Sequence, residues 1–111
     1  MSPKTPNALL HGTLEALILK TLVAGPRHGY AIATFIEQAT GESVVVEEGS
    51  LYPALYRMER RGWLEAEWGT SELGRRAKLY RLTDAGRAQL AEETETWRRF
   101  AAGISKILLA R

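Results

Sequence analysis

The spacing of apolar residues changes period twice along this chain, and that change restricts the possible folds more than any other feature. Up to about residue 61 the apolar side chains recur at helical intervals of three and four. From Leu64 to Leu82 they alternate with polar residues, as they do in strands that bury one face. Helical spacing then resumes and continues to about Leu109. The sequence therefore predicts helices, then a β-hairpin, and then one long helix.

Two helices are predicted in the first forty residues. The first begins at about Leu9 and ends at Gly25-Pro26, because proline cannot continue the hydrogen-bond ladder. One face of it carries Leu10, Leu14, Leu17, Ile18, Thr21 and Leu22. The second runs from about Gly29 to Ala39 and stops before Gly41. Its inward side chains are expected to be Ile32, Phe35 and Ile36.

A third helix is predicted to end at about Arg61, with Pro53 in its first turn, where the missing N–H leaves no bond unmade. Its buried stripe is Leu51, Leu55 and Met58. Its opposite side carries polar and aromatic residues: Ser50, Pro53, Arg57 and Arg60, with Tyr52 and Tyr56 beside them. The β-branched run Val44–Val46 before it could form a short strand that pairs with the later hairpin.

The hairpin and the last helix follow Gly62. The two alternating runs are joined by a polar loop bounded by glycines, which predicts a β-hairpin. Thr83 is expected to cap the last helix, with Asp84 in its first turn. That helix carries a stripe in steps of four and three, which normally needs a partner helix: Leu90, Thr94, Trp97, Ala101, Ile104 and Leu108. Packing against a neighbouring subunit is the expected arrangement.

Composition excludes several classes of protein. The 111 residues suit one domain, and the absence of cysteine excludes disulfides and thiolate metal sites. No apolar run approaches a membrane span and the N-terminus lacks a signal core, so we expect a cytoplasmic protein. His11 and His28 have no partners at ligand spacing, so no metal or cofactor is expected. The sequence also lacks a nucleophile–base set and phosphate-binding glycine motifs, which argues against an enzyme.

The order of the elements predicts a mainly α fold with a small β-hairpin, namely a winged helix-turn-helix over residues 9–82. Residues 1–8 precede it as an arm, and residues 83–111 follow as a long C-terminal dimerisation helix. In such folds the third helix enters the DNA major groove and the hairpin contacts the flanking backbone. The net charge of +2 says little, but eleven arginines against four lysines suit phosphate binding.

Four stretches resemble the PadR family of bacterial transcriptional regulators in sequence, order and spacing. They are Leu14–Leu19, His28–Ile32, Gly49–Leu55 and Tyr80–Gly86. The resemblance implies a homodimer that binds an inverted-repeat operator and usually represses, and the single last helix resembles the family's short class. Family members often regulate an adjacent transporter or detoxification gene. Met58 and Trp63 depart from the usual residues at their positions, and both departures concern packing.

Residues in three places are candidates for contact with DNA: the third helix, the hairpin and the start of the second helix. Hydroxyl and guanidinium groups on the third helix and basic residues of the hairpin can bind phosphates or base edges, and Tyr30 opens the second helix, where free N–H groups attract anions. These candidates are Ser50, Tyr52, Tyr56, Arg57, Arg60, Arg75, Arg76, Lys78 and Tyr30. The alternative is a solvated helix face and loop, with Tyr30 packed. Arg61 lies nearer the buried stripe, where it suits a structural role.

A further set is expected at the dimer interface: Leu10, Leu14, Leu90, Trp97, Ala101, Ile104 and Leu108. Near a two-fold axis a residue approaches its own copy. Paired Trp97 rings could therefore line a slot for a small aromatic effector, as the family resemblance suggests, whereas the alternative is that Trp97 belongs to a core. The other function considered is a winged helix that binds a protein, with its basic face solvated.

Overall fold

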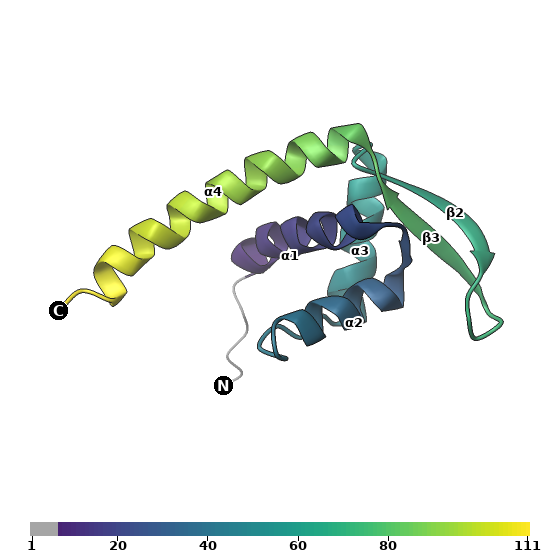
Figure 1. The fold of residues 1–111 in the computed structure, drawn as a ribbon, viewed down its shortest axis with the longest axis horizontal. Coiled ribbons are helices and arrows are strands. Elements are labelled where there is room, and N and C mark those ends of the chain that lie inside the picture. The colour runs from purple at the N-terminus through teal and green to yellow at the C-terminus, as the bar shows by residue number, and fades with distance from the viewer. Residues whose placement is uncertain (1–6) are drawn as a thin grey trace.

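Residues 7–111, whose backbone the computed structural model describes, form four α-helices and one three-stranded antiparallel sheet (Figure 1). The elements follow one another as α1 (Asn7–Thr21), the 3-10 turn η1 (Leu22–Ala24), β1 (Arg27–His28), α2 (Gly29–Ala39), α3 (Glu48–Arg60), β2 (Leu64–Thr70), β3 (Arg76–Leu82) and α4 (Asp84–Leu108). This order confirms the mainly helical fold with a hairpin and a long last helix. Side chains are described from Gly12 onward, so the predicted interface residue Leu10 and residues 1–6 of the predicted arm lie outside the described residues.

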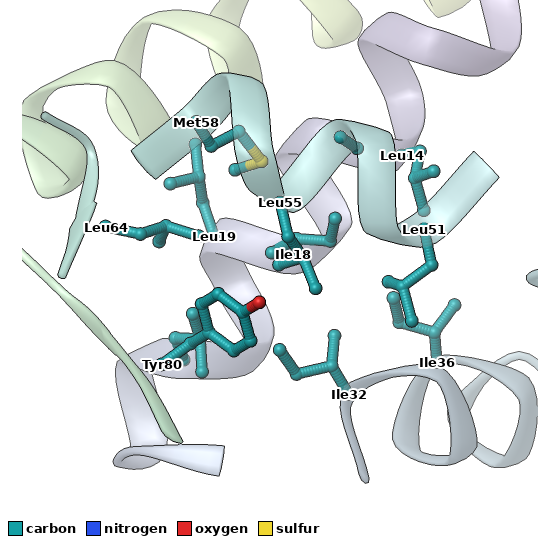
Figure 2. Packing of buried hydrophobic residues seen from close by; sticks show 12 residues of the cluster. Leu14, Ile18, Leu19, Ile32, Ile36, Leu51, Leu55, Met58, Leu64 and Tyr80 are labelled. Atoms are coloured by element: carbon teal, nitrogen blue, oxygen red, sulfur yellow. The ribbon is translucent and has the colours of Figure 1, made fainter. Parts of the chain in front are cut away.

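The core lies where α1, α2 and α3 meet the inner end of the sheet. Figure 2 shows side chains from these elements pointing toward one another. The buried stripe predicted for α3 is confirmed, because Leu51, Leu55 and Met58 are all buried in this cluster. Leu14 of α1 also lies there, 2% exposed. Its assignment to a dimer interface therefore does not fit, since its surface is already covered within one protomer.

The predicted strand at Val44–Val46 is wrong, because this segment is an irregular link between α2 and α3. The backbone N–H of Val44 donates to Thr40 Oγ1 at 3.2 Å, and that of Val46 donates to Glu37 Oε2 at 3.0 Å. The side chains of Glu37 in α2 and of its C-cap residue Thr40 therefore occupy donors that a strand would use in its ladder. The third strand is β1 instead, where Arg27 pairs with Tyr80 of β3.

Phe35 was predicted to point inward, and this is also wrong. Ile32 and Ile36 fill the inner face of α2, whereas Phe35 is 40% exposed. The guanidinium of Arg27 lies over the Phe35 ring, with Cζ 4.7 Å from the ring centroid. A cation over its face thus partly covers this ring on the outside of the molecule.

Helix α3 starts earlier than the proline suggested. It begins at Glu48, so Pro53 lies in its second turn rather than its first. The proline cannot donate to the carbonyl of Gly49, but both residues are exposed, and water can reach that carbonyl. Burial of Leu51 and Leu55 on the other side of the helix offsets the missing bond.

Helix α4 begins with the predicted cap. The Thr83 hydroxyl accepts from the Gly86 N–H at 3.0 Å and donates to the Gly62 carbonyl at 2.6 Å. The first half of α4 packs on α1, and its second half extends past α1 in Figure 1. Among the described residues, no helix is long and apolar enough to cross a membrane.

Candidate nucleic-acid interface

The outer face of α3 presents Tyr52, Tyr56 and Arg60, all exposed. Arg60 Nη1 donates to the Tyr56 hydroxyl at 3.2 Å, and its Cζ lies 5.6 Å from the centre of the Tyr56 ring. The tyrosine thus limits where the guanidinium can point. Ser50 lies half-buried in the first turn of this helix.

Tyr52 packs against the start of α2. A Cβ atom placed on Gly29 would lie 2.9 Å from Tyr52 Cε1, so a glycine at this position lets α2 and α3 approach. This contact joins two of the recognised stretches, His28–Ile32 and Gly49–Leu55. Burial, followed by the charge of Glu48, raises the pKa of Tyr52. Its hydroxyl therefore stays protonated at neutral pH and can donate a hydrogen bond to an acceptor.

Arg57, predicted to contact DNA, is already engaged within the protein. Its Nε and Nη2 donate to Oε2 of Glu15 on α1, at 3.3 and 3.2 Å. Arg61 Nη1 lies 3.8 Å from the other oxygen of Glu15, and its guanidinium covers the Trp63 ring. Arg61 therefore has structural contacts, as its place beside the buried stripe suggested.

The hairpin of β2 and β3 has two faces of different character. In the register of the two strands, Ala66 pairs with Tyr80 and Trp68 pairs with Lys78. Residues two apart share a side of the sheet, so the side that begins at the buried Tyr80 continues outward to Trp68, Lys78 and Arg76. Arg76 Cζ and Lys78 Nζ lie 4.7 and 5.6 Å from the centre of the Trp68 ring. Lys78 Nζ also pairs with Glu59 of α3 at 3.2 Å, which ties this face to α3.

The opposite face of the hairpin carries two glutamates, and both pair with one arginine. Arg81 pairs with Glu67 at 3.1 Å and with Glu65 at 3.8 Å. Glu65 and Glu67 lie on the face of the hairpin opposite Trp68, Arg76 and Lys78. They face away, so the acidic groups do not compete for the cations on the Trp68 face.

Several basic groups of this surface have no acidic partner. Among the side chains from Gly12 onward, no carboxylate forms an ion pair with Arg60, Arg75 or Arg76. Arg75 lies exposed in the loop between the strands, where its backbone N–H donates to Ser71 Oγ. These arginines can each accept an anionic ligand without breaking an existing pair.

Tyr30 and His28 lie where α2 begins. His28 Nδ1 bonds the Lys78 carbonyl at 3.0 Å, and its ring stacks on that of Tyr30 with 6.1 Å between centroids. Tyr30 remains exposed, so its hydroxyl is accessible. In the part of the chain with described side chains, no group of three or more histidine, cysteine, aspartate or glutamate residues could hold a metal ion.

The second half of α4 presents a separate, apolar surface. Trp97, Phe100 and Ile104 are exposed at helical spacing, and Ile107 and Leu108 continue them toward the end of the helix. Leu90, at the other end of the predicted stripe, packs against the protomer's own core, and Ala101 is half-buried. Of the predicted stripe, its C-terminal residues thus belong to the apolar surface, together with Phe100 and Ile107.

Three residues that shape the basic surface of α3 and the hairpin were not predicted to do so: Glu15, Glu59 and Trp68. Each acts on a side chain far away in sequence, as Glu15 does on Arg57. An acidic residue within the apolar face of α1 was the one available indication for Glu15, because buried acids are usually paired.

A helix pair α2–α3 followed by a hairpin, with Tyr56 and Arg60 outward and a basic strip on the hairpin, defines a winged helix-turn-helix protein. Residues 18–92 match the transcriptional regulator PadR-like family, and the chain belongs to that family. The membership confirms the resemblance seen in the sequence. It also confirms that the protein is a transcriptional regulator and not an enzyme. Regulators of this family bind DNA and commonly dimerise.

Solved structures and a curated relative agree with this assignment. A transcriptional regulator from Clostridium thermocellum has a TM-score of 0.82 and 30% identity, covering 91% of this chain and 98% of that one. A PadR-like transcriptional regulator from Bacillus cereus has a TM-score of 0.75 and 31% identity, covering 94% and 99%. A transcriptional regulator from Mycobacterium tuberculosis is 37% identical over 67 residues, which are 60% of this chain and 49% of that protein.

Proposed function

We propose that this regulator is a homodimer that binds an inverted-repeat DNA operator, with α3 in the major groove and the hairpin against the flanking backbone. The observation that carries the proposal is the pairing of an outward Tyr56–Arg60 face on α3 with the basic strip of Arg76 and Lys78 on the hairpin. The Lys78–Glu59 ion pair links the two surfaces, so both can be presented to one duplex.

The proposed contacts divide by chemistry. Arg60 and the hydroxyl groups of Ser50, Tyr52 and Tyr56 are suited to base edges and nearby phosphates. The hairpin residues Arg75, Arg76 and Lys78, with Tyr30 at the start of α2, are suited to the flanking backbone. Arg57 belongs to the same surface, but its side chain is paired with Glu15 of α1.

Dimerisation is proposed to use α4. The exposed Trp97, Phe100, Ile104 and Leu108 form an apolar surface that a second copy of the same helix can cover. We accordingly divide the chain into residues 1–8, a DNA-binding domain over 9–82 and a dimerisation helix over 83–111. Two recognition helices placed by such a dimer must lie about one helical turn of DNA apart, ~34 Å, or a multiple of it.

The regulatory direction and the effector are further parts of the proposal. We infer a repressor of an adjacent transporter or detoxification gene, acting in the cytoplasm on chromosomal DNA. The position of Trp97 supports release by a small aromatic effector, because this residue is 52% exposed on the surface that the second copy would cover. Two such rings near the two-fold axis can stack on a flat ligand.

A gel-shift titration at increasing salt tests the proposed function. The probes are the DNA upstream of the gene for this chain and a random duplex of equal length. We expect specific binding whose log K falls with log salt by about 0.9 per phosphate contact. The triple variant Arg60→Ala, Arg75→Ala and Arg76→Ala should weaken binding and flatten this slope, whereas Lys20→Ala, exposed on α1, should do neither.

Two results would count against this function. Equal affinity for the upstream and random duplexes would exclude sequence-specific recognition. A triple variant that stays dimeric and binds DNA like the unsubstituted protein would exclude this surface, and would favour a winged helix that binds a protein.

A further inference from the structure

Glu15 is the least expected charge in the fold. It lies on α1 beneath α3 and is 7% exposed, among side chains that are otherwise apolar. Both of its oxygens face arginines of α3. Oε2 accepts two hydrogen bonds from Arg57, and Oε1 lies 3.8 Å from Arg61 Nη1.

A buried carboxylate holds its partners more firmly than an exposed one does, because removing a partner leaves a charge that water cannot reach. Arg57 offers two N–H groups to one oxygen, and hydrogen bonds between charged groups are the stronger kind. Its side chain is correspondingly only a third exposed. Arg57 therefore differs from Arg60, which is exposed and bonded to the neutral Tyr56 hydroxyl.

These arginines lie next to the surface that would face DNA. Tyr56, Arg57, Arg60 and Arg61 together line an open hollow of about 440 Å³ on the side of α3. Without Glu15, the three guanidinium groups around this hollow would lose the carboxylate that bonds Arg57 and lies beside Arg61. With Glu15 present, Arg57 and Arg61 both contact α1 through it, although the Arg61 side chain remains 53% exposed, whereas Arg60 bonds the neutral Tyr56 hydroxyl.

We propose that Glu15 is a specificity-determining residue, which holds Arg57 and Arg61 against α1 and so removes them from the cations that bind phosphate regardless of sequence. The proposal rests on the proposed function. Contacts between arginine and phosphate raise affinity for every duplex alike, whereas base contacts raise it for the operator. Restraining two arginines therefore lowers non-specific binding while Tyr56 and Arg60 still reach the bases.

The test compares variants of the full chain by the salt dependence of binding to operator and to random duplex. Glu15→Gln keeps the shape of the side chain but removes the charge that holds the arginines. We expect its salt slope to steepen by about 0.9 for each arginine released, thus by roughly 1–2. Its affinity for random duplex should increase more than its affinity for the operator, so the ratio of the two falls.

The double variant Glu15→Gln with Arg57→Gln guards against misfolding, because it leaves neither partner with an unpaired buried charge. Its salt slope should equal that of the unsubstituted protein, or exceed it by about 0.9 if Arg61 alone is released. Arg75→Gln, in the hairpin loop, is the control for an arginine assigned to the phosphate backbone, and its slope should flatten by about 0.9. Circular dichroism confirms that each variant is folded before its slope is measured.

Two outcomes would overturn the role of Glu15. One is a folded Glu15→Gln variant whose slope and specificity ratio match the unsubstituted protein. The other is a double variant whose slope is flatter by about 0.9, since Arg57 would then contact phosphate in the native protein. Failure of the proposed function looks different, because Arg75→Gln and the other hairpin substitutions would then leave every slope unchanged.

Discussion

Single residues decide how closely the elements of this fold approach one another, and Gly86 is the clearest case. A Cβ atom at this position would overlap the Trp63 carbonyl oxygen and would lie 2.7 Å from Leu82 Cδ1. Thr83 caps the same first turn of α4 and also bonds Gly62, so this helix starts in contact with the link between α3 and β2. This contact gives a physical reason for the stretch Leu-Thr-Asp-Ala-Gly, which sequence comparison alone marks as a motif.

Gly86→Ala should therefore lower the free energy of unfolding by about 1–3 kcal/mol, the usual cost of forcing extra volume into a packed site. The obstructing atom is backbone, so it cannot move aside cheaply. Urea unfolding measures the change. Gly103→Ala, in the same helix but with open space around the added Cβ, should instead raise stability by roughly 0.5–1 kcal/mol. Equal effects from the two substitutions would contradict the explanation.

Glu93 gives a prediction about pH. Burial, then the charges of Glu15 and Glu92, raise the pKa of Glu93, although Gln89 and Arg61 oppose this. Within the described part of the chain its Oε1 is buried without a hydrogen-bond partner. A carboxyl with a raised folded pKa contributes most below its ordinary pKa of 4.5, and that contribution is lost as pH rises through the raised value.

Glu93→Gln should thus stabilise the protein at pH 7 and have little effect near pH 4. A gain of roughly 1–4 °C in Tm corresponds to part of a kcal/mol in a domain of this size. Thermal unfolding between pH 4 and pH 8 measures it, with the exposed Glu72→Gln in the hairpin loop as the control. A gain that persists unchanged at pH 4 would show that the carboxyl charge is not its cause.

At the scale of elements, the hairpin separates its charges between two faces. One face carries Trp68 with Arg76 and Lys78, and the other carries Arg81 between two glutamates. The strand register produces this separation, since residues two apart share a face. The hairpin can therefore present cations to a phosphate backbone while its own acidic residues point elsewhere.

Trp68→Ala should weaken DNA binding although the ring carries no charge, because Arg76 and Lys78 lose the surface that orients them. Exposed cation–π contacts contribute about 0.5–1 kcal/mol, which corresponds to a loss of roughly 2–5-fold in affinity. Trp68→Phe should retain part of the effect, and the exposed Leu73→Ala in the loop should be neutral. A cycle that combines Trp68→Ala with Arg76→Ala measures the coupling, which must be non-zero for this explanation to hold.

The element boundaries show which parts of the fold were accessible from sequence. Helix α2 has the predicted bounds because periodicity and flanking glycines agreed there. The link at Val44–Val46 was misjudged because β-branched residues favour strands locally, while side chains of α2 had already taken two of its N–H groups. Strand β1 is two residues long, too short for any period.

Some contacts of the candidate DNA-binding surface could likewise be predicted from the sequence, and others could not. An outward Tyr56 and Arg60 on α3 followed from helical spacing, since the buried stripe on the other side was clear. The pair between Glu15 and Arg57 did not follow, because it joins residues 42 apart and depends on how α1 crosses α3. Spacing along one helix reports its faces, but it does not report what packs against them.

At the scale of the whole molecule, one protomer leaves much of α4 uncovered. Apart from Ala101, every residue from Thr94 to Arg111 is exposed. A second copy is the partner we propose for this surface, and it would also set the distance between the two recognition helices. Affinity for a two-part operator then depends on the stability of the dimer.

Trp97→Ala should weaken the dimer, because a tryptophan at the centre of an interface commonly contributes roughly 2 kcal/mol or more, about 30-fold in Kd. Sedimentation measures the dimer, and gel shifts should show a parallel loss on the full operator with less loss on a half-site. Thr96→Ala, its exposed neighbour, is the control. A dimer unaffected by Trp97→Ala would place the interface elsewhere.

The uneven packing of α4 also determines where its backbone amides exchange with solvent. Its first turns are fixed by the Thr83 cap and by contacts with α1, so their hydrogen bonds open only when the domain unfolds. The turns after Trp97 lack such support within one protomer and should exchange rapidly by fraying when the protein is dilute. Deuterium uptake at these turns should therefore fall as protein concentration rises, and the uptake at each concentration reports how much of the protein is assembled.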